Sequence, residues 1–242
     1  MVQTENDYKD IIGTTFETYD NITEQRVMQY HHKQELVTVK GLMEKMTISN
    51  FDQIIDLGCS DGSWYNDFKS MGFKKLIGIE LSTERAEKAR KRGYDEVFNC
   101  NAKKTPITSD STEFIISNNA FVHILQDEDK IQVLNEIRRV LSKNGVFIMN
   151  FGNSTGYGHK KNTTVKYISY ITLNTMKKLV QESGLKIEHI VPCYYRIPRI
   201  GANPKLAKFF TKVIFPCVDR FLKFVGNRKN AKVIYLGLRK IN

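Results

Sequence analysis

Hydrophobic residues in this chain form two kinds of pattern, short continuous runs and longer segments with helical spacing. The short runs are typical of strands that are buried on both faces of a sheet. The longer segments have apolar residues three and four positions apart, which predicts amphipathic helices. The expected strands cover 53–58, 74–82, 96–102, 113–120 and 146–152, and the expected helices cover 22–46, 63–71, 83–93 and 127–145.

The alternation of strands and helices predicts an α/β fold. Such an order favours right-handed crossovers and a parallel sheet with helices on both faces. A polar loop follows at 153–164, then a helix that begins at Thr172 and two further strands at 186–197 and 232–238. Because no linker divides the chain, we expect one domain. Its expected parts are a helical cap (1–46), a core (47–197), a basic helical insertion (198–230) and a last strand (231–242).

Charge is distributed unevenly along the 242 residues. The net charge is +11, and the part from Tyr195 onward has twelve basic residues and one acidic residue, a net +11 on its own. Such asymmetry favours an anionic partner or surface. No apolar run approaches the roughly 20 residues of a membrane span, and the polar N-terminal decapeptide is unlike a secretory signal. We therefore expect a cytoplasmic protein, with four scattered cysteines that lack metal-ligand spacing.

The stretch IIDLGCSDGSWY (54–65) joins a predicted buried strand to a predicted helix. Gly58 and Gly62 allow the backbone to approach a ligand closely and to adopt positive φ. The spacing differs from the G-x-G-x-x-G turn that binds a dinucleotide pyrophosphate, and Asp61 would repel a phosphate. The turn therefore suits a ligand that has a positive amine and no phosphate.

This stretch resembles motif I of class I S-adenosylmethionine-dependent methyltransferases, a hydrophobic pair followed by D/E-x-G-x-G-x-G. Ser60 replaces the middle glycine of that motif. The segment EIRRVLSKNGVFIM (136–149) resembles the E-x-x-R-V-L-K-P-G-G pattern of the family. An acid common in the family's fourth strand is missing, because Ile115 follows Phe114. The resemblance covers about 50–192 and implies a seven-stranded, mostly parallel sheet whose last strand is antiparallel.

The resemblance also implies the cofactor, S-adenosylmethionine, and the positions that bind it. Glu80 is expected to accept hydrogen bonds from the ribose hydroxyls, and Asn101 to lie near the adenine. Asn118 and Asn119 are expected to flank the methionine end. The expected cofactor-binding residues are Asp56, Gly58, Cys59, Ser60, Gly62, Glu80, Leu81, Asn101, Ala102, Asn118 and Asn119.

The acceptor side is less defined by the sequence. His123 follows the fourth strand, and its unperturbed pKa near ~6.5 would let it take a proton from a hydroxyl acceptor. Packing against the cofactor pocket is an equally good interpretation of this histidine. The other expected substrate-side residues are His159, Tyr157, Tyr30 and His31, and no metal site is expected.

The segment 203–225 combines phenylalanines on one helical face with lysines on another, and Pro216 is expected to bend or split that helix. A basic, Phe-rich amphipathic helix can lie on a membrane surface, cover an apolar substrate, or pack on the sheet. We expect methyl transfer to a small-molecule, lipid-linked or anionic metabolite, with possible peripheral membrane contact through 203–225. Two alternatives stay open: an RNA methyltransferase that uses the basic tail, and a protein that binds the cofactor without catalysis.

Overall fold

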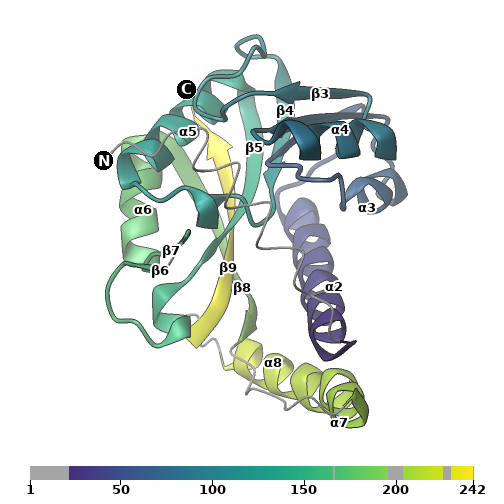
Figure 1. Ribbon diagram of the computed structural model, residues 1–242. Coiled ribbons are helices and arrows are strands. Elements are labelled where there is room, and N and C mark those ends of the chain that lie inside the picture. Colours follow the sequence, from purple (N-terminus) through teal and green to yellow (C-terminus); the bar gives the residue numbers. More distant parts are fainter. Residues whose placement is uncertain (1–21, 166, 196–203, 226–229, 242) are drawn as a thin grey trace.

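The computed structural model describes residues 22–165, 167–195, 204–225 and 230–241 (Figure 1). Residues 1–21 of the expected cap lie outside this range. The helices are α2 (Ile22–Lys45), α3 (Tyr65–Ser70), α4 (Thr83–Arg92), α5 (Asp127–Val140), α6 (Leu173–Glu182), α7 (Pro204–Phe209) and α8 (Phe215–Phe224), with the 3-10 turns η1 (Phe121–His123) and η2 (Ser154–Tyr157) and the π-helical turn η3 (Phe210–Ile214). The strands are β1 (Gln53–Leu57), β2 (Lys75–Glu80), β3 (Glu96–Asn99), β4 (Thr112–Ser117), β5 (Leu141–Gly152), β6 (Thr163–Val165), β7 (Ile168–Tyr170), β8 (Leu185–Tyr195) and β9 (Ala231–Lys240).

Seven strands form the central sheet, in the order β3-β2-β1-β4-β5-β9-β8. The pairs among β1 to β5 are all parallel, and β9 runs antiparallel to both of its neighbours. The predicted seven-stranded sheet with an antiparallel last strand is therefore confirmed. The strand order reverses between β1 and β4, and in open α/β sheets the ligand crevice lies at the carboxyl ends of the strands at this point.

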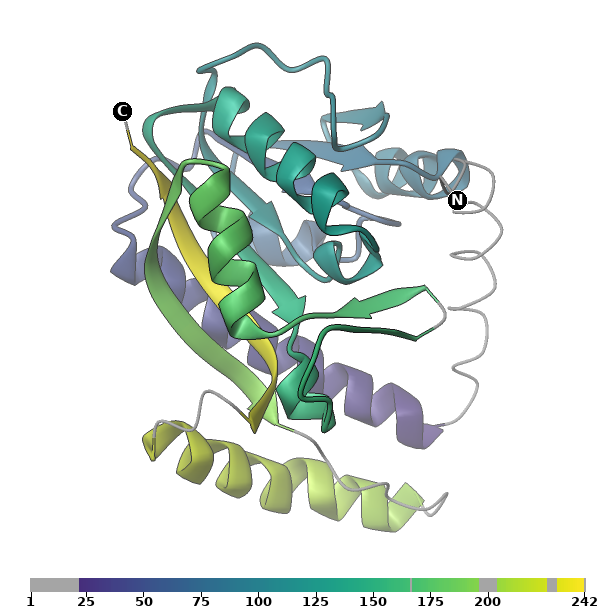
Figure 2. The same ribbon diagram turned by 90° about the vertical axis from the view of Figure 1, so that its left-hand side faces the viewer.

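Helices cover both faces of the sheet, as expected. Helices α5 and α6 pack on one face, where they lie in front of the sheet in Figure 2, and α2 lies behind it. The apolar stripes of α3 and α4 join that of α2 on the second face. Two hydrophobic clusters thus enclose the strands, and the apolar side chains of β1 and β4 are divided between them.

One helix ends earlier than its sequence pattern suggested. The helix expected over 127–145 ends at Val140, and Leu141 is already extended and pairs with Thr112 of β4. Leu141 is completely buried in that pairing, so tertiary packing outweighs the helical propensity of the next residues. Asn144 then takes a left-handed conformation, with φ of 64°, at the turn into the parallel part of β5.

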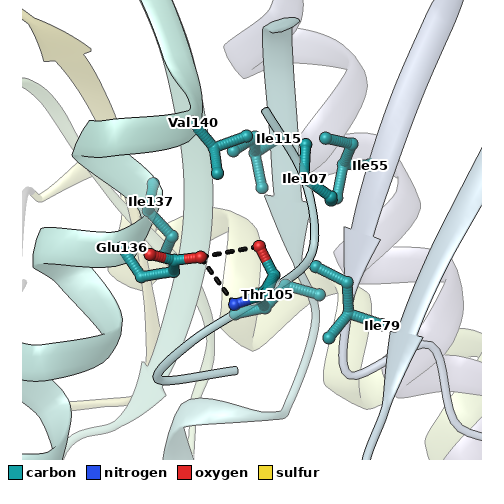
Figure 3. A pocket seen from close by; sticks show the side chains of 9 residues that line it. Ile55, Ile79, Thr105, Ile107, Ile115, Glu136, Ile137 and Val140 are labelled. Carbon is teal, nitrogen blue, oxygen red and sulfur yellow. Dashed lines mark hydrogen bonds between the residues drawn. The ribbon is translucent and has the colours of Figure 1, made fainter. Parts of the chain in front are cut away.

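The family-like E-x-x-R pattern on α5 has a structural role. Oε1 of Glu136 accepts hydrogen bonds from the backbone N–H and the hydroxyl of Thr105, at 2.6 and 2.7 Å. Arg139 donates to the same carboxylate. Figure 3 shows this link beside a small gap that is lined mainly by aliphatic side chains of α5 and the sheet. Glu136 and Arg139 therefore link the loop after β3 to α5.

Between β8 and β9, residues 204–224 form one interrupted helix along α2 and β8, outside the sheet (Figures 1 and 2). Proline has no N–H, and its ring collides with the carbonyl four residues earlier. The chain accommodates Pro216 through the wider π-helical turn η3, which directly precedes α8. The helix is thus interrupted at this point, and a single segment still runs from Pro204 to Phe224.

Candidate functional site

The turn after β1 has the backbone conformation that its glycines predict. Gly58 and Gly62 both have φ of 77°, and Ser60 between them has φ of 52°. A Cβ atom on Gly58 would lie 2.4 Å from the Cβ of Ala120, which follows β4. The turn and the β4 loop therefore pass each other in contact, and only glycine fits at this crossing.

Glu80 at the end of β2 holds this turn in place. Its two carboxylate oxygens accept hydrogen bonds from the backbone N–H groups of Ser60 and Ser82, each at 2.9 Å. The side chain is 7% exposed, and burial raises the pKa of this carboxyl group. Arg85 of α4 lies near, with Nη1 3.3 Å from the hydroxyl of Ser60. Each carboxylate oxygen retains a second lone pair that can accept from a ligand hydroxyl.

Two other predicted residues of the turn face inward. Asp56 is buried and accepts a hydrogen bond of 2.6 Å from the hydroxyl of Tyr94. Burial raises the pKa of Asp56 to about 7, although the Tyr94 bond opposes that shift. The thiol of Cys59 packs against Gly78, where an added Cβ would lie 2.6 Å from the sulfur. Asp56 and Cys59 therefore support the turn from inside the fold.

The predicted adenine-side residues lie at the ends of β2 and β3. The backbone carbonyl of Leu81 accepts from the Asn99 amide at 2.8 Å. The side chain of Asn101 accepts from the N–H of Lys103 at 2.9 Å, and Ala102 is partly buried against the core. These positions form the rim of the crevice beyond Glu80.

Two asparagines after β4 meet a buried polar network. Asn118 accepts from the hydroxyl of Tyr235 at 3.0 Å, whereas its buried Nδ2 has no hydrogen-bond partner among the described residues. Asn119 has φ of 59° and exchanges two hydrogen bonds with the side chain of Asn150, at 2.7 and 2.8 Å. Its Nδ2 donates to Glu35 of α2 at 3.1 Å.

Helix α2 contributes three polar side chains to contacts with β8, with α8 and with the loop after β4. His31 stacks on Tyr194 of β8, with ring centroids 4.1 Å apart and an interplanar angle of 6°. Burial and nearby Lys232 lower the pKa of His31 to about 3, so it is neutral. Glu35 lies one turn further along and is 4% exposed. Tyr30 donates to Asp219 of α8, which also accepts from the backbone N–H of Tyr195 at 3.2 Å.

The remaining predicted acceptor-side residues gather around the hairpin of β6 and β7. Nδ1 of His123 lies 3.4 Å from the carbonyl oxygen of Tyr167, and burial lowers the pKa of this histidine. The ring of Tyr157 contacts that of Tyr170, at 4.0 Å between centroids, and His159 lies 6.4 Å from the same ring. His31, on α2, stacks on a different ring. The sequence therefore predicted residues that the fold places in two groups, one at the hairpin and one at α2.

Sequence reasoning missed Glu35, Tyr94, Tyr194 and the Tyr30–Asp219 link. Their partners are 24 to 189 positions away in the chain, so no local motif marks them. One signal was present for Glu35, which stands at helical spacing with the buried residues Val39 and Leu42. An acid on a buried helical stripe points to a polar partner inside the fold.

Comparison with known proteins agrees with this architecture. Residues 55–149 match the family described as "Methyltransferase domain". Residues 55–149 thus carry a methyltransferase domain, and the sheet has the class I methyltransferase fold. The cofactor of the domain is S-adenosylmethionine. This domain contains the glycine turn, Glu80, Asn118 and Asn119, whereas α2 and the basic segment lie outside the matched residues.

Curated proteins and solved structures are also similar to this chain. An uncharacterised methyltransferase of Schizosaccharomyces pombe is 28% identical over 117 residues, 47% of this chain and 45% of that protein. The chain thus spans less than half of that relative. A putative methyltransferase of Haloferax volcanii, solved with the Trm112 activator, has a TM-score of 0.65 at 15% identity and 97% coverage of both chains. Geranyl diphosphate C-methyltransferase of Streptomyces coelicolor has a TM-score of 0.59 at 16% identity, covering 87% of this chain and 82% of its own. At these identities the two structures show a shared fold.

The residues around the crevice fit this cofactor. The class I fold places a buried carboxylate, Glu80, at the end of β2 and a close backbone approach at Gly58. The unpartnered Nδ2 of Asn118 is a buried donor at the end of β4. A carboxylate or other acceptor on a ligand would satisfy this amide, since a buried donor without a partner costs free energy.

Proposed function

We propose that the methyl acceptor is a lipid-like or anionic amphiphile presented at a membrane surface. The observation that supports this proposal is the outer face of 204–225. Phe221 and Phe224 of α8 are 63% and 87% exposed, and Phe209 of α7 is 54% exposed. Large apolar side chains gathered on one segment favour an interaction surface over a solvated helix.

The charges of this segment favour an anionic partner. Its single acid, Asp219, is buried against α2 and bonded to Tyr30. The exposed side chains include Lys205, Lys208, Lys212 and Arg220. A face with phenylalanines between basic side chains matches the composition of helices that lie in the interface of anionic membranes, where each basic residue contributes about 1 kcal/mol. No described helix combines the length and the apolar composition that a membrane crossing requires.

The cofactor residues are part of the same proposal. Glu80 would bind the ribose hydroxyls, and Asn101 with Ala102 would lie beside the adenine. Asn118 and Asn119 would bind the methionine end, where the Nδ2 of Asn118 is a ready donor. The cofactor supplies an electrophilic methyl group, so the protein's contribution is to position the acceptor and exclude water. His123, Tyr157 and His159 are proposed to line the acceptor path at the hairpin.

Transfer of label identifies the acceptor class. The protein is incubated with methyl-labelled cofactor and a cell extract, which is then separated into organic-phase, aqueous small-molecule, RNA and protein fractions. Label in the organic phase or in anionic metabolites supports the proposal. Label in RNA, with binding that falls steeply with salt, would support an RNA methyltransferase instead. Cofactor binding without label in any fraction would indicate a non-catalytic protein.

Vesicle flotation tests the membrane surface separately. The wild-type protein should float with vesicles that contain phosphatidylserine and not with phosphatidylcholine alone. The double variant Phe221→Ser/Phe224→Ser should lose flotation. Val165→Ser replaces another exposed apolar side chain (47% exposed), in the β6–β7 hairpin, and should leave flotation unchanged. Equal flotation of the double variant and the wild type would contradict this use of α8.

A further inference from the structure

A carboxyl group without a cationic partner lies beneath the loop that follows β4. Glu35 of α2 is 4% exposed, and in the described part of the chain it forms no ion pair with Lys or Arg. Its Oε1 accepts from Nδ2 of Asn119 at 3.1 Å and lies 3.5 Å from the hydroxyl of Tyr194. Burying a carboxylate without a compensating charge is costly, and replacement by an apolar side chain would remove that cost. The acid therefore calls for a functional explanation.

The carboxyl group has one oxygen available for a ligand. Both of its hydrogen bonds to described residues fall on Oε1. Asn119 is exposed and bonded to Glu35, so it connects this carboxyl group to the surface at the carboxyl end of β4. The neighbouring wall is aromatic, with His31 stacked on Tyr194, and the Nε2 of His31 is buried without a hydrogen-bond partner among described residues.

We propose that Glu35 is the catalytic base, which takes the proton from a hydroxyl group on an acceptor with an apolar body. The inference rests on the proposed function and assigns a base to that same site. The acceptor O–H gives its proton to Oε2 of Glu35, and the oxygen electron pair forms the bond to the methyl carbon. The carbon–sulfur bond breaks with its electron pair on sulfur, so the sulfonium becomes a neutral thioether. Asn119 holds the carboxyl group from the cofactor side, and Tyr194 holds it from β8.

The electrostatic surroundings suit a base that acts near neutral pH. Burial raises the pKa of Glu35 to about 7, while Asn119, His32 and Tyr194 oppose the shift. A base with a pKa near the working pH combines availability with driving force. The other titratable groups that face it are His32 of α2, which is paired with Asp67 at 2.9 Å, and Tyr157, Cys193, Tyr194 and Tyr235, whose pKa values burial raises. These four groups stay neutral while Glu35 changes charge.

His123 is the competing candidate for the base, and its contacts differ from those of Glu35. Its Nδ1 points to the carbonyl of Tyr167 in the β6–β7 connection, and no hydrogen bond joins it to Asn119 or to α2 within the described residues. If His123 were the base, its replacement by Gln would remove the pH dependence of the rate. If Glu35 is the base, Glu35→Gln removes it and His123→Gln leaves it in place.

The experiment combines rate and cofactor affinity in matched variants. Glu35→Gln keeps the shape and the hydrogen bond to Asn119, whereas Glu44→Gln changes an exposed acid of the same helix. The substrate is the extract fraction that the wild-type protein labels. We expect Glu35→Gln to lower the transfer rate about 100-fold or more and to abolish its rise through pH 7. Calorimetry should show cofactor affinity within threefold of wild type, and Glu44→Gln should match the wild type in both assays.

The possible failures are distinguishable. If Glu35→Gln transfers label as fast as the wild type does, the role of Glu35 is overturned and the proposed function stands. A loss of cofactor affinity of more than tenfold in Glu35→Gln would show that the carboxylate balances the charge of the cofactor, which also overturns the proposal. Absence of transfer by the wild type to any fraction would overturn the proposed function and, with it, the role of Glu35.

Discussion

Replacing Glu35 by Gln should change how the stability of the protein depends on pH. The carboxyl group has a pKa of 4.5 in an unperturbed setting and about 7 in the folded protein, because burial disfavours its charged form. The folded state therefore binds this proton more tightly than the unfolded state does. Its contribution to stability is fully present below pH 4.5 and is lost as the pH rises to about 7. A shift from 4.5 to about 7, at 1.36 kcal/mol per pH unit, corresponds to about 3 kcal/mol.

Urea denaturation of the wild type and of Glu35→Gln between pH 4 and pH 8 measures this term. The free energy of unfolding of the variant, relative to the wild type, should rise by about 3 kcal/mol across that range. Asp56 also has a pKa raised to about 7, and it contributes equally to both proteins, so its effect cancels in the difference. A difference that stays constant with pH would refute the claim that Glu35 is ionised at a cost inside the fold.

Two further changes test the glycine turn and its support. Gly58→Ala combines positive φ with a contact of 2.4 Å to Ala120, so it should destabilise the protein by more than the roughly 1–2 kcal/mol of backbone strain and weaken cofactor binding at least tenfold. The control Gly72→Ala has φ of 100° with no other atom within 4 Å of the added Cβ. It should show the strain alone, with unchanged cofactor affinity in calorimetry. Tyr94→Phe removes the hydrogen bond to buried Asp56 and should cost about 1–3 kcal/mol, with a larger loss at pH 8 than at pH 5, because the ionised carboxylate depends more on that bond. Equal losses at both pH values in urea denaturation would contradict this account of Asp56.

The parallel part of the sheet could be predicted from the sequence because its strands contain short apolar runs, such as residues 54–55 in β1 and 114–116 in β4. The β6–β7 hairpin could not, since each of its strands has only three residues, too few for an alternating pattern. The early end of α5 was missed for another reason. Leu141 leaves the helix because pairing with Thr112 buries it, and that pairing joins positions far apart in the chain.

The candidate site likewise has a part that the sequence predicted and a part that it could not predict. The turn around Gly58 and Gly62 is local, so its residue types and spacing indicate its conformation directly. The contribution of α2 is not local. Glu35 meets Asn119 across 84 positions and Tyr194 across 159, and only the folded chain brings these three together. The sequence therefore predicted the conformation of the turn well, and it predicted the expected acceptor side only as a set of separate aromatic and histidine positions.

Calorimetric titration with S-adenosylmethionine tests most directly whether the turn and Glu80 form the cofactor site. The wild type should bind one molecule per chain. Glu80→Gln should bind at least tenfold more weakly, because it removes the carboxylate at the end of β2 that faces the turn. Glu84→Gln, which changes an exposed acid paired with Lys88 on α4, should bind as the wild type does. Equal affinity of Glu80→Gln and the wild type would contradict the account.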